Sequence, residues 1–501
     1  MSNTPQTKKG LGTFDFFCVG FGAIVGVGWA VSLNKWMASA GGPVPATLGY
    51  LITLVLMVPV GLCFAELVPM LPVAGGTTAF TYRAFGEKAS YVAGWLTLGA
   101  FLTLMPWEAI YVVDIASILF PALKAGAPLY VLAGSNIYLG HIVEGTIIAL
   151  FFFYINYKGA DLAAGLQKVL CIFLIGVGVL SMVCGLVKFD VNNLMPVYEN
   201  IGTSAHNSMF GGMFAILATS PFFLCGFENI PQAVEDAGGS HKKVGFTVLL
   251  SIIMACLFYA LLLFCIGAAW PWQDFYLNTE SPAAANVFAK IFASSAMGNV
   301  MYILLCAGAL CGLLTTWNSF FMGTANLMMA LARTHMLPFA LSKRSAKTGT
   351  PVNALIVCLV ASIVCLVASI VGPFLGLGLI DPLTTFSAAA YVVSWGLAAF
   401  CLIKLRKTEP NLPRPYKIPG GLPMAWFAAL SMVAILIIMF IPGTPAYIGG
   451  MAVKMFLAWC VVGVAMFLAT APSRNQKSPE ERYNNLFANA AQQHQKDLMM
   501  D

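Results

Sequence analysis

Charged side chains are scarce in this sequence. Asp, Glu, Lys and Arg make up 9% of its 501 residues, whereas a soluble globular protein has about 25%. Hydrophobic residues make up 59%, and the mean hydropathy is +0.84. Such a chain lacks the polar side chains that cover a water-soluble globule, so the composition predicts a polytopic membrane protein.

Residue clusters that hold metals or carry out catalysis are also missing. The five histidines are scattered and show no zinc-ligand spacing. The 13 cysteines lie in or beside apolar stretches, and none forms a spaced pair in an outward loop. We therefore expect no metal, no cofactor and no disulfide framework. A membrane-embedded enzyme or a channel remains a remote alternative, because neither clustered catalytic residues nor filter repeats are present.

Apolar runs of about 20 residues, the length that crosses a bilayer, recur along the whole chain. We place twelve spans, at residues 14–38, 44–69, 89–120, 138–157, 164–187, 209–236, 244–270, 299–331, 352–371, 383–404, 424–441 and 447–470. The first run has no small-residue cleavage site after it, so we expect a retained helix. The chain is then a leader (1–13), one transmembrane domain (14–470) and a solvated tail (471–501). We also expect a short helix over the outer mouth, at residues 282–294.

Positive charge follows the topology of these spans. With the N-terminus in the cytoplasm, 21 of the 26 Lys and Arg residues fall in cytoplasmic segments, as the positive-inside rule requires. We therefore expect both termini in the cytoplasm and a location in the cell membrane, the inner membrane if the source is bacterial. The net charge of +6 thus points to a lipid bilayer and not to nucleic acid.

The first apolar run is flawed as a membrane helix. Its middle carries Gly22, Gly26 and Gly28, and each glycine weakens a helix by about 1 kcal/mol relative to alanine. Broken backbone at membrane depth is tolerated only where it is buried in protein or lines a cavity. Close helix packing between glycines is the alternative explanation.

The sixth run breaks in the same way, at Ser220-Pro221 and Cys225-Gly226. Interrupted helices at corresponding positions of two halves are typical of a transporter's binding site. Spans 1–5 and 6–10 would then form two inverted repeats, with spans 11 and 12 outside them.

Four segments resemble the amino acid–polyamine–organocation (APC) superfamily of permeases. They are Gly22 to Gly28; Ala65-Glu66-Leu67 with Pro72, Gly75-Gly76 and Tyr82 to Gly86; Gly226 to Asn229 with Glu235-Asp236; and Leu337-Pro338 with Lys347 to Pro351 and Arg414 to Gly421. The resemblance covers roughly residues 14 to 470. It implies the LeuT-type fold, a 5+5 inverted repeat with broken helices 1 and 6.

Helix ends suggest how a substrate is held. The first break frees N–H groups that suit a carboxylate, and the second frees carbonyls that suit an ammonium group. A zwitterion between the two breaks also matches the family. The predicted substrate-binding residues are Ile24, Val25, Gly26, Val27, Gly28, Met105, Phe222, Cys225, Gly226, Phe227 and Asn318. Among them, Met105, Phe222 and Asn318 rest on the resemblance.

Ionisable residues inside the spans are functional candidates. Glu228 matches a position that acts in proton sensing in some family members; a carboxylate tied to the broken backbone is the alternative. Phe222 matches an aromatic residue that closes over substrate, or is a packed core residue. Lys35 and Glu108 could pair above the cavity; alternatively, Lys35 reaches the outer interface and Glu108 faces a water-filled vestibule. Glu66 is expected to anchor cytoplasmic loops.

The sequence departs from the family at two positions. A lysine that some members carry in span 5 is Leu174 here, and an arginine eight residues after Asn318 is Asn326. The coupling ion, H+ or Na+, therefore stays open. The favoured function is secondary-active transport of an amino acid or related amine by alternating access, with uptake coupled to an ion gradient. An exchanger (antiporter) of amino acids and amines is the alternative.

Overall fold

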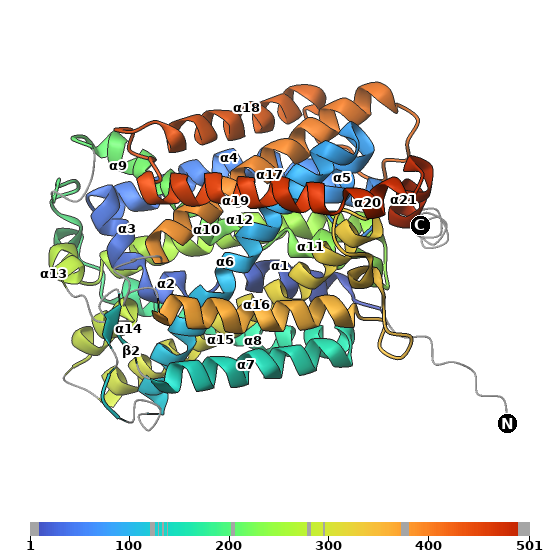
Figure 1. The fold of residues 1–501 in the computed structure, drawn as a ribbon. Coiled ribbons are helices and arrows are strands. Elements are labelled where there is room, and N and C mark those ends of the chain that lie inside the picture. The colour runs from blue at the N-terminus through green and yellow to red at the C-terminus, as the bar shows by residue number, and fades with distance from the viewer. Residues whose placement is uncertain are drawn as a thin grey trace.

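The chain folds into a bundle of long helices that run between two ends of the molecule (Figure 1). The computed structural model describes residues 10–120, 126–128, 130–132, 135–137, 139–201, 206–277, 282–293, 296–371 and 380–488. Within these ranges, eight helices are long and apolar enough to cross a membrane. The prediction of an all-α polytopic membrane protein is confirmed. The number of twelve spans and their inverted repeat stay predictions.

Uninterrupted helices make up most of the bundle. They are α4 (Pro43–Met70), α6 (Glu87–Leu119), α7 (Leu139–Lys158), α8 (Ala160–Val187), α12 (His241–Gly267), α15 (Ala296–Arg333), α16 (Val352–Val371), α17 (Ile380–Thr408), α18 (Gly421–Phe440) and α19 (Gly450–Ala469). The turn before α4 shows how the sequence sets these bounds. Gly41 ends the preceding helix at a φ of +78°, and Pro43 opens α4, as glycine and proline commonly do at helix ends.

Two segments cross the bundle in pieces, as predicted. The first consists of α1 (Thr13–Ile24), α2 (Gly28–Val31) and α3 (Leu33–Ala40). The second consists of α9 (Met209–Ala215), the 3-10 turn η3 (Ile216–Ala218), α10 (Ser220–Leu224) and α11 (Asn229–Gln232). Helix α1 packs against α8, α12 and α15, so the interrupted backbone lies inside the bundle and away from lipid.

Short elements lie at the two ends of the bundle. They are α5 (Thr77–Phe85), α13 (Trp272–Leu277), α14 (Ala283–Ile291), α20 (Ala471–Asn475), α21 (Pro479–Phe487), the turns η2 (Val191–Leu194), η4 (Val234–Asp236) and η5 (Phe339–Ser342), and an antiparallel hairpin of β1 (Tyr130–Leu132) and β2 (Ser135–Ile137). Helix α14 confirms the helix predicted within residues 282–294. It packs against α2, α3 and α15.

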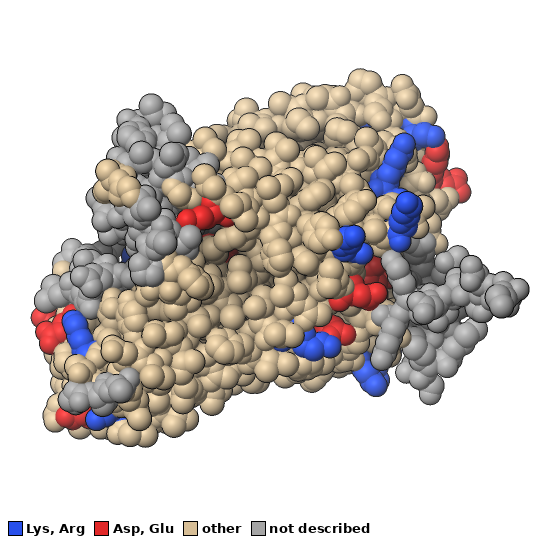
Figure 2. All heavy atoms as spheres, turned by 90° about the horizontal axis from the view of Figure 1, so that it is seen from below, with Lys and Arg blue, Asp and Glu red and all other residues tan. Residues whose placement is uncertain are grey.

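The outer surface of the bundle is an uncharged belt between two charged ends. Figure 2 shows acidic and basic side chains gathered towards both ends of one face. Large apolar side chains are exposed on the belt, for example Ile147 on α7 (58% exposed), Val169 on α8 (67%) and Val461 on α19 (69%). Such a surface is stable in contact with lipid and not with water.

Helix α1 begins at one end of the bundle, and α20 and α21 lie at the same end (Figure 1). We call this end the basic end. There the fully buried Glu66 accepts hydrogen bonds from Arg406 Nε (2.9 Å) and from the amide of Ile418 (2.8 Å). Glu66 thus holds the end of α17 and the connector to α18. Its predicted anchoring role is confirmed.

The tail differs from the prediction of a solvated segment. Residues 471–487 form α20 and α21, and Leu486 and Phe487 are 1% and 8% exposed. Arg474 Nε and Arg482 Nη2 bind the two oxygens of Glu87 on α6, at 2.7 and 2.8 Å. Apolar burial and these ion pairs together dock the tail onto the helices that it follows.

Candidate functional site

The first helix break leaves backbone donors without partners. The amide of Val25 still bonds to Phe21 O (2.8 Å), and that of Gly26 to Ile24 O (3.1 Å). Within the described part of the chain, the amides of Val27, Gly28 and Trp29 find no backbone acceptor. They lie at the start of α2, where free N–H groups favour negative charge.

The glycines of this break also meet close neighbours. A Cβ atom on Gly26 would lie 2.8 Å from Thr316 Oγ1 of α15, and one on Gly28 would lie 2.5 Å from a ring carbon of Phe223. The two explanations offered by the sequence therefore coexist. Glycine both breaks the helix and lets α15 and α10 approach its backbone.

The second break lies directly against the first. Gly226 has a φ of +126°, and a Cβ atom there would lie 2.6 Å from the backbone carbon of Ala23. Both the left-handed conformation and the contact require glycine. The Cys225 thiol donates to Phe222 O at 2.8 Å, so this carbonyl at the end of α10 already accepts a hydrogen bond from a nearby side chain.

Glu228 stabilises this second break through hydrogen bonds. Its Oε2 accepts a hydrogen bond from the amide of Gly226 (2.7 Å), and its Oε1 accepts one from the indole Nε1 of Trp395 on α17. The side chain is 3% exposed. Two N–H donors compensate a buried carboxylate, which supports the alternative that Glu228 is tied to the broken backbone.

A small cavity separates the two breaks. Its volume is about 20 Å³, which is close to the space that one water molecule needs. The residues that line it come from both broken segments and from α6, α12 and α15: Ala23, Ile24, Gly26, Val27, Gly28, Leu104, Glu108, Phe222, Phe223, Cys225, Tyr259 and Thr316. An amino acid fits only after the surrounding helices move apart.

Glu108 of α6 is the acidic residue of this cavity wall. It is 1% exposed, and its Oε1 lies 3.6 Å from the position of a Cβ atom on Gly26. Its Oε2 has no hydrogen-bond partner among the described residues. A buried carboxylate oxygen without a donor is costly, which marks Glu108 as a functional candidate.

The predicted pair of Lys35 and Glu108 is wrong. Lys35 is exposed on α3, and no ion pair within the described residues joins it to the buried Glu108. The chain is interrupted a second time at Ser32, between α2 and α3. Solvation of the Lys35 ammonium costs less than its burial, so the lysine reaches the surface.

Most of the predicted backbone positions line the cavity, whereas several predicted side chains do not. Val25, Gly226, Phe227 and Asn318 are buried but lie outside its wall. The side chain of Met105 lies outside the described part of the structure.

Asn318 belongs instead to a polar network that joins four helices. Its Nδ2 donates to Gln167 Oε1 (3.0 Å), and its Oδ1 accepts from Asn156 Nδ2 (3.0 Å). Gln167 Nε2 in turn donates to Cys18 O of α1 (3.2 Å). Because these amides bond to one another, Asn318 connects α1, α7, α8 and α15.

Sequence reasoning missed five residues of the cavity wall: Ala23, Leu104, Phe223, Tyr259 and Thr316. The Tyr259 hydroxyl donates to Ile24 O at 2.9 Å, and Thr316 Oγ1 donates to Gly312 O at 3.0 Å. Both are polar residues within apolar spans, and that position was the available signal. A polar residue within an apolar span does not by itself indicate which face of the helix lines the cavity.

Comparison with known proteins agrees with this geometry. The family model for amino acid permeases matches residues 16–474. The chain belongs to the amino acid permease family. The members of this family and the similar proteins below are transporters, so this permease is a transporter and not an enzyme.

Several similar proteins are named as transporters of different amino acids. The permease is 24% identical to the branched-chain amino acid permease BcaP of Bacillus subtilis (strain 168), over 93% of this chain and 94% of that protein. It is 24% identical to the aspartate-proton symporter of the same organism, over 92% and 84%. It is 23% identical to the aromatic amino acid transport protein AroP of Escherichia coli (strain K12), over 91% and 94%.

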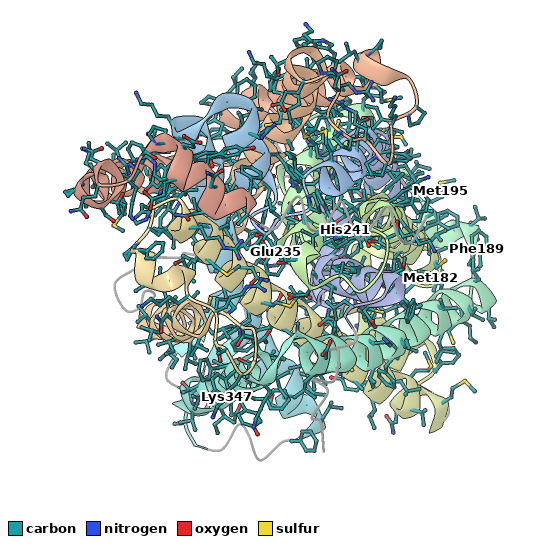
Figure 3. All side chains as sticks on the ribbon, turned by 90° about the vertical axis from the view of Figure 1, so that its right-hand side faces the viewer. Met182, Phe189, Met195, Glu235, His241 and Lys347 are labelled. Carbon is teal, nitrogen blue, oxygen red and sulfur yellow. The ribbon has the colours of Figure 1, made fainter. Side chains whose placement is uncertain are left out.

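A larger cavity of the permease opens at the basic end. Its volume is about 1130 Å³, and Gly10, Asn156, Glu235, His241 and Asn326 are part of its wall. Figure 3 shows Glu235 and His241 near the middle of this end. Glu235 accepts hydrogen bonds from Arg333 Nη1 (2.6 Å) and from the amide of Ala74 (2.9 Å). These contacts hold η4 between α15 and the segment that joins α4 to α5.

Proposed function

We propose that this permease moves an amino acid or a related amine across the cell membrane by alternating access. The observation that carries the proposal is the contact of two helix breaks around one closed cavity. The amides of Val27, Gly28 and Trp29 suit the substrate carboxylate, and the carbonyl end of α10 suits its ammonium group. A zwitterion complements both breaks at once.

Alternating access is supported by the difference between the two cavities. The inner cavity of about 20 Å³ is small and lined by buried residues at the breaks, whereas the cavity of about 1130 Å³ lies at the basic end. Substrate release into the larger cavity would require α1 and α10 to separate. Phe222 and Phe223, whose rings meet edge to face at 5.2 Å, are the proposed gate on one wall.

We place the basic end in the cytoplasm, because most Lys and Arg residues lie in the segments assigned to that side. Both termini are then cytoplasmic, and the helices follow the LeuT-type inverted repeat proposed from the sequence. The named substrates of the relatives include branched-chain and aromatic amino acids and aspartate. Their diversity supports an amino acid substrate without selecting one side chain.

Transport coupled to an ion gradient and exchange of two substrates share this geometry. We favour uptake coupled to H+ or Na+. Glu228, the proton-sensing candidate from the sequence, accepts hydrogen bonds from Gly226 and Trp395, which favours the alternative that it holds the second break. Net uptake into empty liposomes under an imposed gradient supports coupled transport. Uptake that requires a second substrate inside the liposomes supports the exchanger.

The test is a counterflow screen in proteoliposomes. Liposomes preloaded with one unlabelled amino acid or amine receive the labelled compound outside, and accumulation without any ion gradient identifies a substrate. Gly26→Ala should reduce counterflow at least tenfold, since its Cβ would enter the contact with Thr316. Gly176→Ala in α8, where a Cβ meets nothing within 4 Å, is the matched control. The absence of counterflow for every amino acid and amine would refute the proposal.

A further inference from the structure

We propose that Glu108 binds one positive charge that enters the cavity with the substrate, so that the transported load carries a net charge of +1. The charge comes either from a cationic group of the substrate or from a coupling ion taken up with a neutral substrate. This inference rests on the proposed function and adds a specificity-determining residue to it.

The carboxylate of Glu108 faces the place where the two breaks meet. Its side chain is 1% exposed, its Oε1 approaches Gly26, and its Oε2 is buried without a hydrogen-bond partner among the described residues. Among the described residues that line this cavity, there is no Lys, Arg or His. A buried carboxylate therefore borders the cavity without a cation from the protein.

Nearby hydroxyl groups do not take the place of a cation. The Tyr259 hydroxyl donates its proton to Ile24 O, and Thr316 Oγ1 donates to the carbonyls of Gly312 and Gly22. Glu228, the other carboxylate beside the breaks, accepts from Gly226 and Trp395. Each of these groups has a partner of its own, and among the described side chains of the cavity wall only Glu108 has a buried oxygen without a hydrogen-bond partner.

Charge balance then limits what the closed cavity can hold. A zwitterionic amino acid adds no net charge, and its carboxylate at the first break would lie near the Glu108 carboxylate. Two negative charges in a dry cavity repel strongly. One added positive charge removes this conflict, whether it is an ammonium or guanidinium group of the substrate, a proton or a sodium ion.

Polar groups from several neighbouring elements line the described cavity wall together with Glu108. They are the amides of the α1–α2 break, the Cys225 thiol at the α10 break, the Tyr259 hydroxyl of α12 and the Thr316 hydroxyl of α15. None of these groups supplies a positive charge at neutral pH. The charge must therefore arrive with the load.

The first measurement is net uptake of the substrate, identified by counterflow, under a membrane potential. A tenfold potassium gradient with valinomycin, negative inside, should raise the steady-state accumulation of the substrate about tenfold, as expected for one net charge. Uptake that does not respond to the potential overturns the inference and leaves the proposed function intact. An acidic amino acid as the sole substrate also overturns it.

The second measurement assigns the charge to Glu108. If the substrate is neutral, Glu108→Gln should keep counterflow but lose the response to the potential, to less than twofold. If the substrate is cationic, Glu108→Gln should raise the concentration for half-maximal counterflow at least tenfold. Glu144→Gln on α7 is the matched control, because Glu144 also has a buried oxygen without a partner but lies outside the cavity. Equal behaviour of the two variants overturns the inference.

Binding to the purified wild-type protein decides the question if Glu108→Gln does not fold. Calorimetry should show that a neutral substrate binds at least tenfold more tightly either at a pH two units lower or with sodium added. A cationic substrate should bind at least tenfold more tightly than its uncharged analogue. Affinities that depend on none of these conditions overturn the inference.

Discussion

Carboxylates at the basic end and in the central cavity have different partners. At the basic end, Glu66, Glu87 and Glu235 each meet two arginines. The pairs are Glu66 with Arg406 (2.5 Å) and Arg414 (3.5 Å), Glu87 with Arg474 (2.7 Å) and Arg482 (2.8 Å), and Glu235 with Arg333 (2.6 Å) and Arg344 (3.3 Å). In the cavity, Glu108 meets no cation among the described residues.

This difference in partners separates carboxylates that stabilise the structure from a carboxylate that is available to a ligand. Each carboxylate at the basic end joins segments far apart in the sequence: Glu66 joins α4 to α17, and Glu87 joins α6 to the tail. Those charges are compensated permanently. Glu228 is an intermediate case, since two N–H groups compensate it. Glu108 has neither a cation nor a hydrogen-bond donor for Oε2 among the described residues of the cavity wall, so a ligand can change the free energy of its charged form most.

The largest effect should come from breaking an ion pair at the basic end. Arg406→Ala leaves the fully buried Glu66 with the more distant Arg414, and removal of one partner from a buried pair costs about 3–5 kcal/mol. Unfolding in detergent, followed by denaturant or heat, measures this loss. Arg83→Ala is the control, because Arg83 and Glu409 are 28% and 27% exposed and such pairs contribute about 1 kcal/mol or less. Equal losses in the two variants would contradict the comparison.

The next effect concerns the close contact at the first break. Thr316→Ala should restore part of the counterflow lost in Gly26→Ala, because it removes the Oγ1 atom that the new Cβ would approach to 2.8 Å. We expect recovery of about three- to tenfold from one relieved contact, of the order of 1 kcal/mol. The rate of counterflow of the double variant is compared with both single variants. If the losses in counterflow rate of the two single variants simply add in the double variant, the contact with Thr316 is not the reason why residue 26 must be glycine.

Glu228→Gln should have a smaller effect on stability and none on charge coupling. The new amide group faces an N–H donor, from either Gly226 or Trp395, and leaves it unsatisfied at a cost of about 1–3 kcal/mol. Unfolding and the response of uptake to membrane potential are measured together. If uptake by Glu228→Gln no longer responds to potential or pH while its stability is unchanged, Glu228 is the proton-sensing residue. Glu228 and Glu108 would then both take part in charge coupling.

Lys35→Ala should have the smallest effect. Lys35 is exposed, and no ion pair within the described residues joins it to the buried Glu108, so we expect a change of less than about 0.5 kcal/mol in stability and less than twofold in uptake. In the double variant with Glu108→Ala, the two effects should add. A double variant no worse than the poorer single variant would instead show that the two residues are coupled during transport.

Local composition alone determined the architecture that the structure shows. The scarcity of charge predicted a membrane bundle, and glycines at residues 22–28 and Pro221 to Gly226 predicted two interrupted helices. Both features depend on neighbours in the sequence: a helix weakens where its own residues disfavour it, and an apolar run must be buried or face lipid. The backbone positions of the cavity wall follow from the same breaks.

Tertiary structure decided which side chains meet at those breaks. Tyr259 and Thr316 entered the wall, Asn318 was taken into a network with Gln167, and Lys35 turned to the surface. The docking of the tail onto Glu87 was equally absent from the local pattern. A contact between segments 100 or more residues apart depends on the rotation of each helix and on its neighbours. The residues of one helix do not specify that rotation, so the partners of Glu108 became known only from the packed fold.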